Sequence, residues 1–301
     1  MLTQTIQLWD GRDDARVECY VLYDSPEFQT GARRPAVVIC PGGAYLGTSD
    51  REAEPVALRF AAAGYHAFVL RYTTYFKERI TDWRQLPPPN ERSAFPRPLF
   101  DLAKTMALVR SRAEEWRVDA GRIAVAGFSA GGHLAASLGV HWHEPFLNEA
   151  LGEDNESFRP NALILGYPVL DNRLMRDEAI RAQDERKAGL FRLYSQAVFG
   201  VPDPADEQLA ARSPALHVSG RTPPAFIWHT ADDELVSAQN ALNFALACAR
   251  NNVPYELHVF ASGVHGLSLG DETTASGPEH VNPEAAAWFQ LALNWLKKYM
   301  S

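Results

Sequence analysis

A serine framed by glycines is the residue with the clearest chemical potential in this sequence. Ser129 stands within the segment 127–133, Gly-Phe-Ser-Ala-Gly-Gly-His, which contains a G-x-S-x-G pattern. The apolar run 123–127 is typical of a buried strand, and the run 134–140 is typical of a helix. A strand that turns tightly into a helix holds the intervening side chain out above the sheet, and only glycine fits on both sides of that turn. We therefore predict that Ser129 is a nucleophile; the alternative is a glycine-rich turn with an incidental serine.

His265 is the histidine best placed to activate this serine. A neutral hydroxyl needs an imidazole to remove its proton and a carboxylate to hold the imidazole in the useful tautomer. Among the nine histidines, only His265 lies in a glycine-flanked loop directly after the last predicted strand, 255–260. We predict that it is the general base. His141, His143 and Glu144 superficially resemble metal ligands, but they are close together at one predicted helix end and have no further ligand nearby. We therefore expect neither a metal nor a cofactor.

Two neighbouring aspartates are candidates for the carboxylate. Asp232 and Asp233 both follow the apolar run 225–229, and the order serine, acid, histidine places the acid after a late strand. Successive loop residues usually point in different directions, so only one of them can reach the imidazole. The other is expected to cap the helix that begins near Ser237 or to face solvent.

Backbone amides complete the predicted machinery. Attack on a carbonyl places negative charge on its oxygen, and each N–H group already aimed at that oxygen lowers the barrier by roughly 3 to 4 kcal/mol. One such group is the amide of Ala130, directly after the serine. The second is expected from the segment 40–45, Cys-Pro-Gly-Gly-Ala-Tyr, which follows a strand. We assign it to Gly43 and Ala44, with more weight on Gly43; a plain turn is the alternative.

These residues need a scaffold, and the hydrophobic pattern predicts a mainly parallel sheet flanked by helices. Short apolar runs alternate with helical patterns, and each run has the composition of a strand buried on both faces. An amphipathic helix is predicted over 99–116 and a final one after Pro283, and residues 6–9 and 17–23 are predicted to form an antiparallel pair. The predicted parallel strands are 36–40, 66–71, 123–127, 162–166, 225–229 and 255–260.

Two segments interrupt this alternation within the single domain that we expect over residues 1–301. Residues 72–98 are rich in proline, and residues 171–224 combine a charged helical segment with turns. Ligands of α/β sheets bind beyond the carboxyl ends of the strands. Both insertions are therefore candidate lids or substrate-facing pieces, with plain surface decoration as the alternative.

Composition excludes several classes of function. Hydrophobic residues make up 46% of the 301 positions and charged residues 22%, which is ordinary for a globular protein and unlike disordered or collagen-like chains. The formal charge of −8 disfavours nucleic acid as a partner. Three cysteines without regular spacing indicate a reducing compartment. Without a leader pattern or a bilayer-length apolar run, we expect a cytoplasmic protein that is not bound to membranes; a homo-oligomer is compatible with the sequence.

The motifs together resemble the α/β-hydrolase superfamily, in particular its esterase and lipase branch and the bacterial acetyl-xylan-esterase and feruloyl-esterase-like group. The segments that carry the resemblance are 41–45, 49–52, 127–134 and 228–233. In this group the acid is followed three residues later by valine, which favours Asp233 because of Val236. The resemblance implies a serine carboxylic ester hydrolase that forms an acyl-enzyme from small acyl esters, with acetylated sugars or xylo-oligosaccharides as candidate substrates. A peptidase or amidase of the same fold, or a non-catalytic ligand-binding protein, is the alternative.

Overall fold

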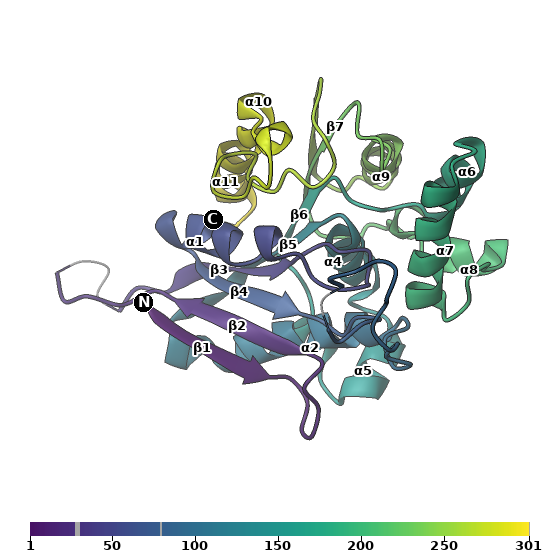
Figure 1. Ribbon diagram of the computed structural model, residues 1–301. Coiled ribbons are helices and arrows are strands. Elements are labelled where there is room, and N and C mark those ends of the chain that lie inside the picture. Colours follow the sequence, from purple (N-terminus) through teal and green to yellow (C-terminus); the bar gives the residue numbers. More distant parts are fainter. Residues whose placement is uncertain (28–30, 79, 301) are drawn as a thin grey trace.

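Eight strands form one sheet with the order β1-β2-β4-β3-β5-β6-β7-β8 (Figure 1). The computed structural model describes residues 1–27, 31–78 and 80–300. The β1–β2 and β2–β4 pairs are antiparallel, and the remaining neighbours in this sheet are parallel. The strands are β1 (Leu2–Gln7), β2 (Arg16–Val21), β3 (Arg34–Cys40), β4 (His66–Arg71), β5 (Val118–Phe128), β6 (Ala162–Gly166), β7 (Ala225–Thr230) and β8 (Tyr255–Phe260).

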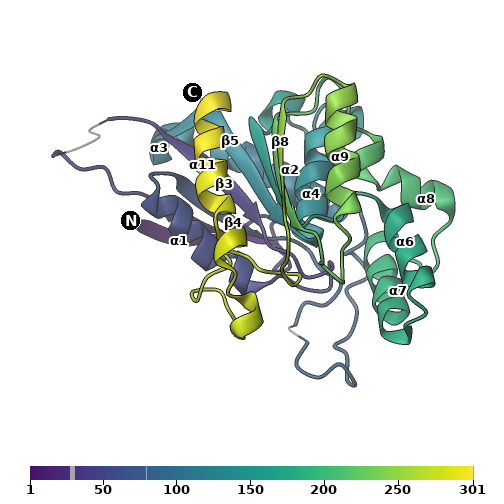
Figure 2. The same cartoon turned by 90° about the horizontal axis from the view of Figure 1, so that it is seen from above.

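Helices cover both faces of the sheet, which confirms the predicted α/β class (Figures 1 and 2). Side chains of α1 and α11 share a core with Val37 and Ile39 of β3, whereas α2, α4 and α9 pack with Val38 on the opposite face. No helix in the described ranges combines the length and apolar character that a bilayer crossing requires. The helices are α1 (Glu54–Ala62), α2 (Arg97–Ser111), α3 (Ala113–Trp116), α4 (Ala130–His141), α5 (Pro145–Leu151), α6 (Asn172–Arg181), α7 (Glu185–Phe199), α8 (Asp206–Ala211), α9 (Gln239–Arg250), α10 (Pro283–Ala286) and α11 (Trp288–Tyr299), with short 3₁₀ turns η1 (Asp50–Glu52), η2 (Asn155–Ser157), η3 (Pro214–Leu216) and η4 (Pro278–His280).

Several elements differ from the sequence-based expectation. β1 covers Leu2–Gln7 instead of 6–9, and β5 begins at Val118, before the predicted 123. β8 is not buried on both faces, because it forms the edge of the described sheet; Tyr255 and Val259 are 41% and 40% exposed. The helix predicted over 99–116 is interrupted at Arg112, whose φ of −99° and ψ of 13° separate α2 from α3. The interruption is local, since Trp116 beyond it is still buried, as the predicted apolar stripe requires.

The two predicted insertions differ in structure. Within the described part of 72–98, a single β-bridge between Phe76 and Pro89 is the regular feature before α2 begins. The segment 171–224 instead folds into α6, α7 and α8, which are grouped together in Figures 1 and 2. Asp171 caps α6 by accepting hydrogen bonds from two backbone amides of its first turn, and Asp184 caps α7 by accepting one from the Arg186 amide.

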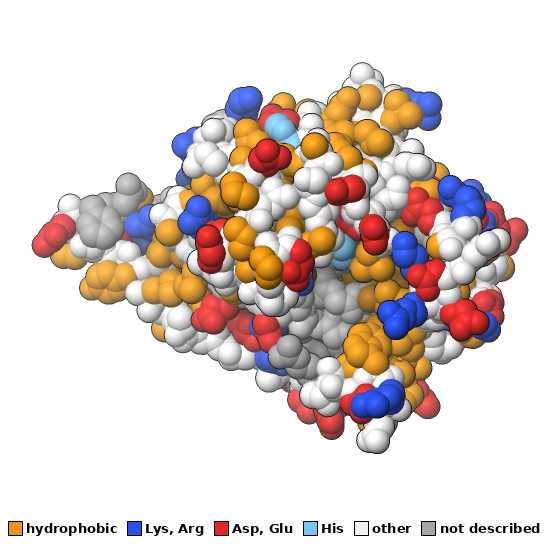
Figure 3. All heavy atoms as spheres, turned by 45° about the horizontal axis from the view of Figure 1, so that its top comes forward, with side chains coloured by type: hydrophobic (Ala, Val, Ile, Leu, Met, Phe, Trp, Pro, Cys, Tyr) orange, Lys and Arg blue, Asp and Glu red, His pale blue; other side chains and the backbone are white. Residues whose placement is uncertain are grey.

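Ion pairs join the inserted helices to one another. Asp206 at the start of α8 pairs with Arg173 at 2.6 Å and with Arg176 at 3.0 Å, both on α6. Side chains of both charge signs are accordingly interspersed with hydrophobic ones on the right of Figure 3, over this part of the molecule. The insertion is thus a helical unit with its own polar contacts.

Candidate active site

Ser129 lies in the sharp turn between β5 and α4. Its φ of 53° and ψ of −119° are unusual for a residue with a side chain, and such strain persists only where the surroundings enforce it. The Ser129 amide donates to the Gly166 carbonyl at 3.0 Å, and its own carbonyl accepts from His133 at 3.0 Å and from Val169 at 3.2 Å. The neighbouring strand and the first turn of α4 therefore hold the serine beyond the end of β5.

Gly131 allows the turn to pack against β3. A Cβ atom built at this position would collide with the backbone carbonyl oxygen of Cys40. Glycine is thus needed here for the close approach of two backbone segments, one of which carries Ser129.

Gly131→Ala should lower the free energy of unfolding by about 3 kcal/mol, because neither backbone can move away without distorting the sheet. Gly189→Ala is the matched control, since Gly189 also lies in a helix, α7, but a Cβ there meets nothing within 4 Å. The control should raise the free energy of unfolding by about 0.5 to 1 kcal/mol. Urea unfolding of both variants measures the contrast, and equal effects would contradict it.

The structure brings together the three side chains that the sequence placed far apart. The His265 Nε2 atom lies 2.8 Å from the Ser129 Oγ atom, and the His265 Nδ1 atom lies 2.7 Å from Oδ2 of Asp233. A carboxylate can only accept, so Nδ1 is the protonated nitrogen and Nε2 presents a lone pair to the serine hydroxyl. This orientation lets the imidazole remove the serine proton.

Asp233 is held as an ionised carboxylate. Its side chain is fully buried, and Oδ1 accepts backbone hydrogen bonds from Leu235 at 2.9 Å and from Val236 at 3.0 Å. Burial alone would raise the pKa of Asp233, but the hydrogen bond and charge of His265, together with the Val236 amide, outweigh it and lower that pKa below its usual value. The group therefore stays charged at neutral pH.

Asp232 takes a different position from its neighbour. Its carboxylate is exposed and accepts a 2.7 Å hydrogen bond from the amide of Gly263, in the loop that carries His265. Of the two roles expected for the second aspartate, it faces solvent and does not cap a helix, because α9 begins only at Gln239 and has no side-chain cap. Asp233 contacts the imidazole, while Asp232 ties the histidine loop to the end of β7.

The predicted oxyanion donors border the serine unequally. Ala130 and Ala44 line the same cavity as Ser129, whereas exposed Gly43 is absent from its described lining. The Ala130 amide begins α4 and so has no intrahelical acceptor. The amides of Gly43 and Ala44 have no acceptor among the described residues. Three unused donors thus stand in the predicted loops, and Ala44 is the one that reaches the cavity from the β3 side.

Gly43 has a conformational role that sequence reasoning missed. Its φ is 128°, its carbonyl accepts from Leu46 at 2.9 Å, and a Cβ there would collide with the Gly47 carbonyl. The tight turn itself therefore explains the glycine at position 43. That turn aims the following residue, Ala44, with a φ of 55°.

A buried histidine supports this turn. The Tyr45 hydroxyl lies 2.7 Å from Nδ1 of His133 in α4, and Nε2 of the same ring lies 2.7 Å from the Arg212 carbonyl oxygen. Burial lowers the pKa of His133 to about 4, so the ring is neutral and donates through Nε2 while it accepts from Tyr45. The contact joins the turn after β3, the helix after the serine and the end of the insertion.

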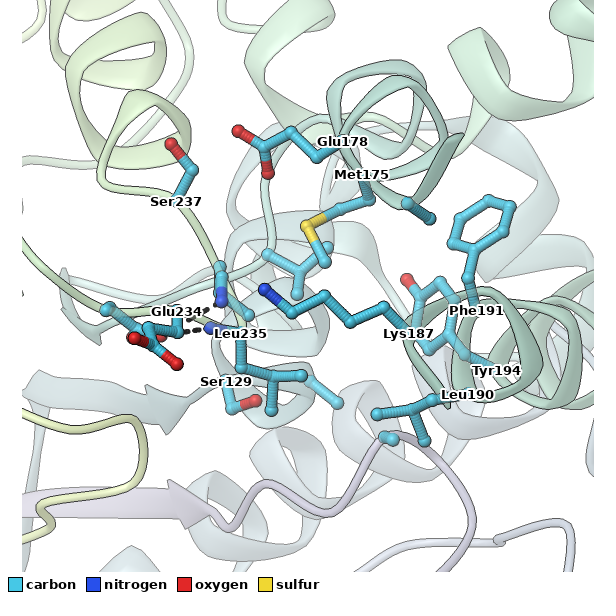
Figure 4. A pocket seen from close by; sticks show the side chains of 16 residues that line it. Ser129, Met175, Glu178, Lys187, Leu190, Phe191, Tyr194, Glu234, Leu235 and Ser237 are labelled. Atoms are coloured by element: carbon cyan, nitrogen blue, oxygen red, sulfur yellow. Dashed lines mark hydrogen bonds between the residues drawn. The ribbon is translucent and has the colours of Figure 1, made fainter. Parts of the chain in front are cut away.

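A cavity of about 280 Å³ opens next to Ser129. The inserted helices α6 and α7 supply one wall, which places the second predicted insertion at the site; no described residue of 72–98 lines this cavity. Figure 4 shows Leu190, Phe191 and Tyr194 opposite Ser129, and Lys187 extended from α7 into the space between them. The cavity lining is mainly apolar, with polar groups at a few points. It consists of Ala44, Ser129, Ala130, Val169, Met175, Glu178, Ala179, Lys187, Leu190, Phe191, Tyr194, Asp233, Glu234, Leu235, Val236 and Ser237.

The site is equipped for nucleophilic acyl transfer. Ser129 lines the cavity together with Ala44 and Ala130, whose amides have no acceptor among the described residues, and behind its hydroxyl lie an imidazole in the accepting tautomer and an orienting carboxylate. The described residues contain no group of three or more histidine, cysteine, aspartate or glutamate side chains that could hold a metal ion.

Comparisons with known proteins agree with this chemistry. The BD-FAE family model matches residues 23–247. The structure is similar to the carboxylesterase Cest-2923 from Lactobacillus plantarum, with a TM-score of 0.80, 30% identity, and coverage of 99% of this chain and 98% of the other. It is also similar to MGS-M1, an α/β-hydrolase enzyme from a deep-sea metagenome library, with a TM-score of 0.73, 32% identity, and coverage of 100% and 98%.

The curated relatives are longer proteins. An acetylxylan esterase from Xylanibacter ruminicola is 25% identical over 87% of this chain, but the match covers only 45% of that protein. Across the curated relatives, the chain spans between 34% and 56% of their lengths. The similarity thus covers most of this chain and about half, or less, of those proteins.

Proposed function

This chain belongs to the BD-FAE family of α/β-hydrolases, and from that premise we propose that it is a serine carboxylesterase acting on small acyl esters. The observation that carries the proposal is the continuous hydrogen-bonded chain from Ser129 through His265 to Asp233. An incidental serine has no such base behind it, and a merely structural histidine would have no reason to contact a strained serine that borders a cavity.

The reaction follows from these positions. Ser129 Oγ attacks the ester carbonyl carbon while His265 Nε2 takes the hydroxyl proton, and the oxyanion accepts hydrogen bonds from Ala130 and from Ala44 or Gly43. Collapse breaks the bond to the alcohol, which leaves with the proton from His265. A water molecule, deprotonated by the same nitrogen, then attacks the acyl-enzyme and releases the acid with the serine hydroxyl restored.

Acetylated sugars or xylo-oligosaccharides are the substrates that we propose within this class. The cavity of about 280 Å³ is small for a ligand site, which favours a short acyl group. Lys187 and Glu178 provide charged groups, from α7 and α6, that can hydrogen bond the hydroxyls of a sugar. The similarity to an acetylxylan esterase also supports an acetylated xylan fragment as the substrate.

The proposal is tested with a substrate panel. We expect hydrolysis of p-nitrophenyl acetate with a kcat/KM at least about ten times that for the octanoate, because a longer chain must displace the apolar wall of the cavity. Acetylated xylo-oligosaccharides should also be deacetylated, as measured by acetate release. Faster turnover of aminoacyl-β-naphthylamides than of esters would instead indicate a peptidase. Failure of a fluorophosphonate to label Ser129 would indicate a non-catalytic protein.

A further inference from the structure

A buried pair, Glu52 and Tyr167, joins the loops that meet at Ser129. We propose that this pair is a positioning device, which sets the oxyanion turn and the histidine loop relative to the serine. The inference rests on the carboxylesterase function proposed above. Both side chains are buried and neither belongs to the described lining of the cavity, so they act through the groups that they contact.

Glu52 fixes the turn that carries the candidate oxyanion donors. It lies in η1, is 3% exposed, and accepts two hydrogen bonds of 2.6 Å, from the Gly42 amide at Oε2 and from the Tyr167 hydroxyl at Oε1. Hydrogen bonds to a buried carboxylate are short and strong, and losing one partner leaves the group poorly compensated. The Glu52 side chain thereby fixes the amide of Gly42, the residue directly before Gly43 and Ala44.

The same turn touches the nucleophile. A Cβ atom built at Gly42 would lie 2.9 Å from Glu52 Oε2 and 2.9 Å from Ser129 Cβ, so Gly42 fills the space between the carboxylate and the serine. A shift of Glu52 would carry the hydrogen-bonded Gly42 peptide with it and so change the position of that peptide relative to Ser129. The relative position of serine and oxyanion turn therefore depends on the carboxylate.

Tyr167 extends the tie to the histidine loop. Its hydroxyl donates to Glu52 and accepts a 2.9 Å hydrogen bond from the amide of Ser268, three residues after His265. The Tyr167 ring meets the His265 ring edge-on, with centroids 5.1 Å apart. Ser268 also links the histidine loop back to η1, because its hydroxyl donates to the carbonyl of Arg51, next to Glu52, at 2.7 Å.

Two further properties suit Tyr167 to this role. Its φ of 36° is rare for an aromatic residue, which indicates that the surroundings enforce the placement of its side chain. Burial and the adjacent Glu52 raise the pKa of Tyr167 well above its usual value, so the phenol keeps the proton that it donates. The tie is consequently present throughout the neutral pH range.

A positioning role predicts a loss in turnover rather than in substrate binding. Tyr167→Phe removes one oxygen and keeps the ring contacts, and Glu52→Gln keeps the shape of the side chain. For each variant we expect kcat for p-nitrophenyl acetate to fall about 10- to 100-fold, the range that a small misplacement of reacting groups produces, while KM changes less than about twofold. Because the two groups act as a unit, the fall in kcat of the double variant should be no larger than that of the more impaired single variant.

The control is Tyr65→Phe, at a second buried tyrosine whose ring packs on Phe60. It should keep the wild-type kcat. Active-site titration with a fluorophosphonate separates the explanations, since a purely structural role would lower the labelled fraction and leave kcat per labelled site unchanged. The proposal would be overturned by an unchanged kcat per labelled site, by an unchanged kcat in Tyr167→Phe, or by losses of the single variants that multiply in the double variant. If Glu52→Gln does not fold, Tyr167→Phe decides alone. Absence of ester turnover in the wild type would instead remove the carboxylesterase function, and this inference with it.

Discussion

Replacing Ser129 by alanine should lower kcat for p-nitrophenyl acetate by roughly 10⁴- to 10⁶-fold. The substitution removes the oxygen that lies 2.8 Å from His265 Nε2, so no acyl-enzyme can form. The residual rate then comes from water in a site whose amides are intact. Alanine also fits the space, so circular dichroism and the midpoint of thermal unfolding should stay close to those of the wild type. Stopped-flow or steady-state release of p-nitrophenol measures the effect.

Ser195→Ala provides the matched control for this experiment. Ser195 is fully buried in α7, and its hydroxyl has no hydrogen-bond partner in the described structure, so its removal should leave turnover unchanged. A Ser129→Ala protein that retained more than a few per cent of the wild-type rate would show that another group attacks the ester. That result would contradict the assignment of Ser129 as the nucleophile.

Asp233→Asn should lower kcat by about 10³- to 10⁴-fold. An amide nitrogen facing Nδ1 of His265 would make that ring nitrogen the acceptor and place the proton on Nε2, so that the lone pair no longer faces Ser129. The loss should appear with little change in KM, because Asp233 acts on the imidazole. Steady-state kinetics on the acetyl ester measure both parameters.

The neighbouring aspartate is the natural comparison. Asp232→Asn should change kcat little, since the asparagine oxygen can still accept the hydrogen bond from the Gly263 amide. The ratio of the two effects therefore assigns the acid directly. If Asp232→Asn abolished turnover and Asp233→Asn did not, the observed pairing with His265 would not be the one used in the reaction.

Local patterns in the sequence were sufficient for much of the fold. Strands 66–71, 162–166 and 255–260 were predicted at their observed limits, since each is a compact apolar run bounded by turn residues. The position of Ser129 also follows from local rules, because a strand, a glycine-framed turn and a helix are contiguous in sequence. What depends on neighbours across the sheet was less accessible, as the partly exposed edge strand β8 shows.

Parts of the site that depend on long-range contacts could not be predicted in this way. Glu52 and Tyr167 are 115 residues apart, and nothing in the types of residues beside them indicates that they form a hydrogen bond. Residue type alone does not separate Asp232 from Asp233, because both are acidic and adjacent; the family resemblance favoured Asp233 through Val236, and the structure pairs Asp233 with His265. The pattern Gly-Gly predicts Gly43 as an oxyanion donor, but its positive φ is a separate, conformational reason for glycine at this position.

The inserted helices have a consequence for how this protein can diversify. Reacting groups stand on loops at the ends of β5, β7 and β8, whereas the opposite wall of the cavity belongs to α6 and α7 of the insertion, and ion pairs join α6 to α8. Substitution of Phe191 or Lys187 would therefore change which substrates enter the cavity without changing the residues that break the ester bond. Selectivity and reactivity can evolve on separate stretches of the polypeptide.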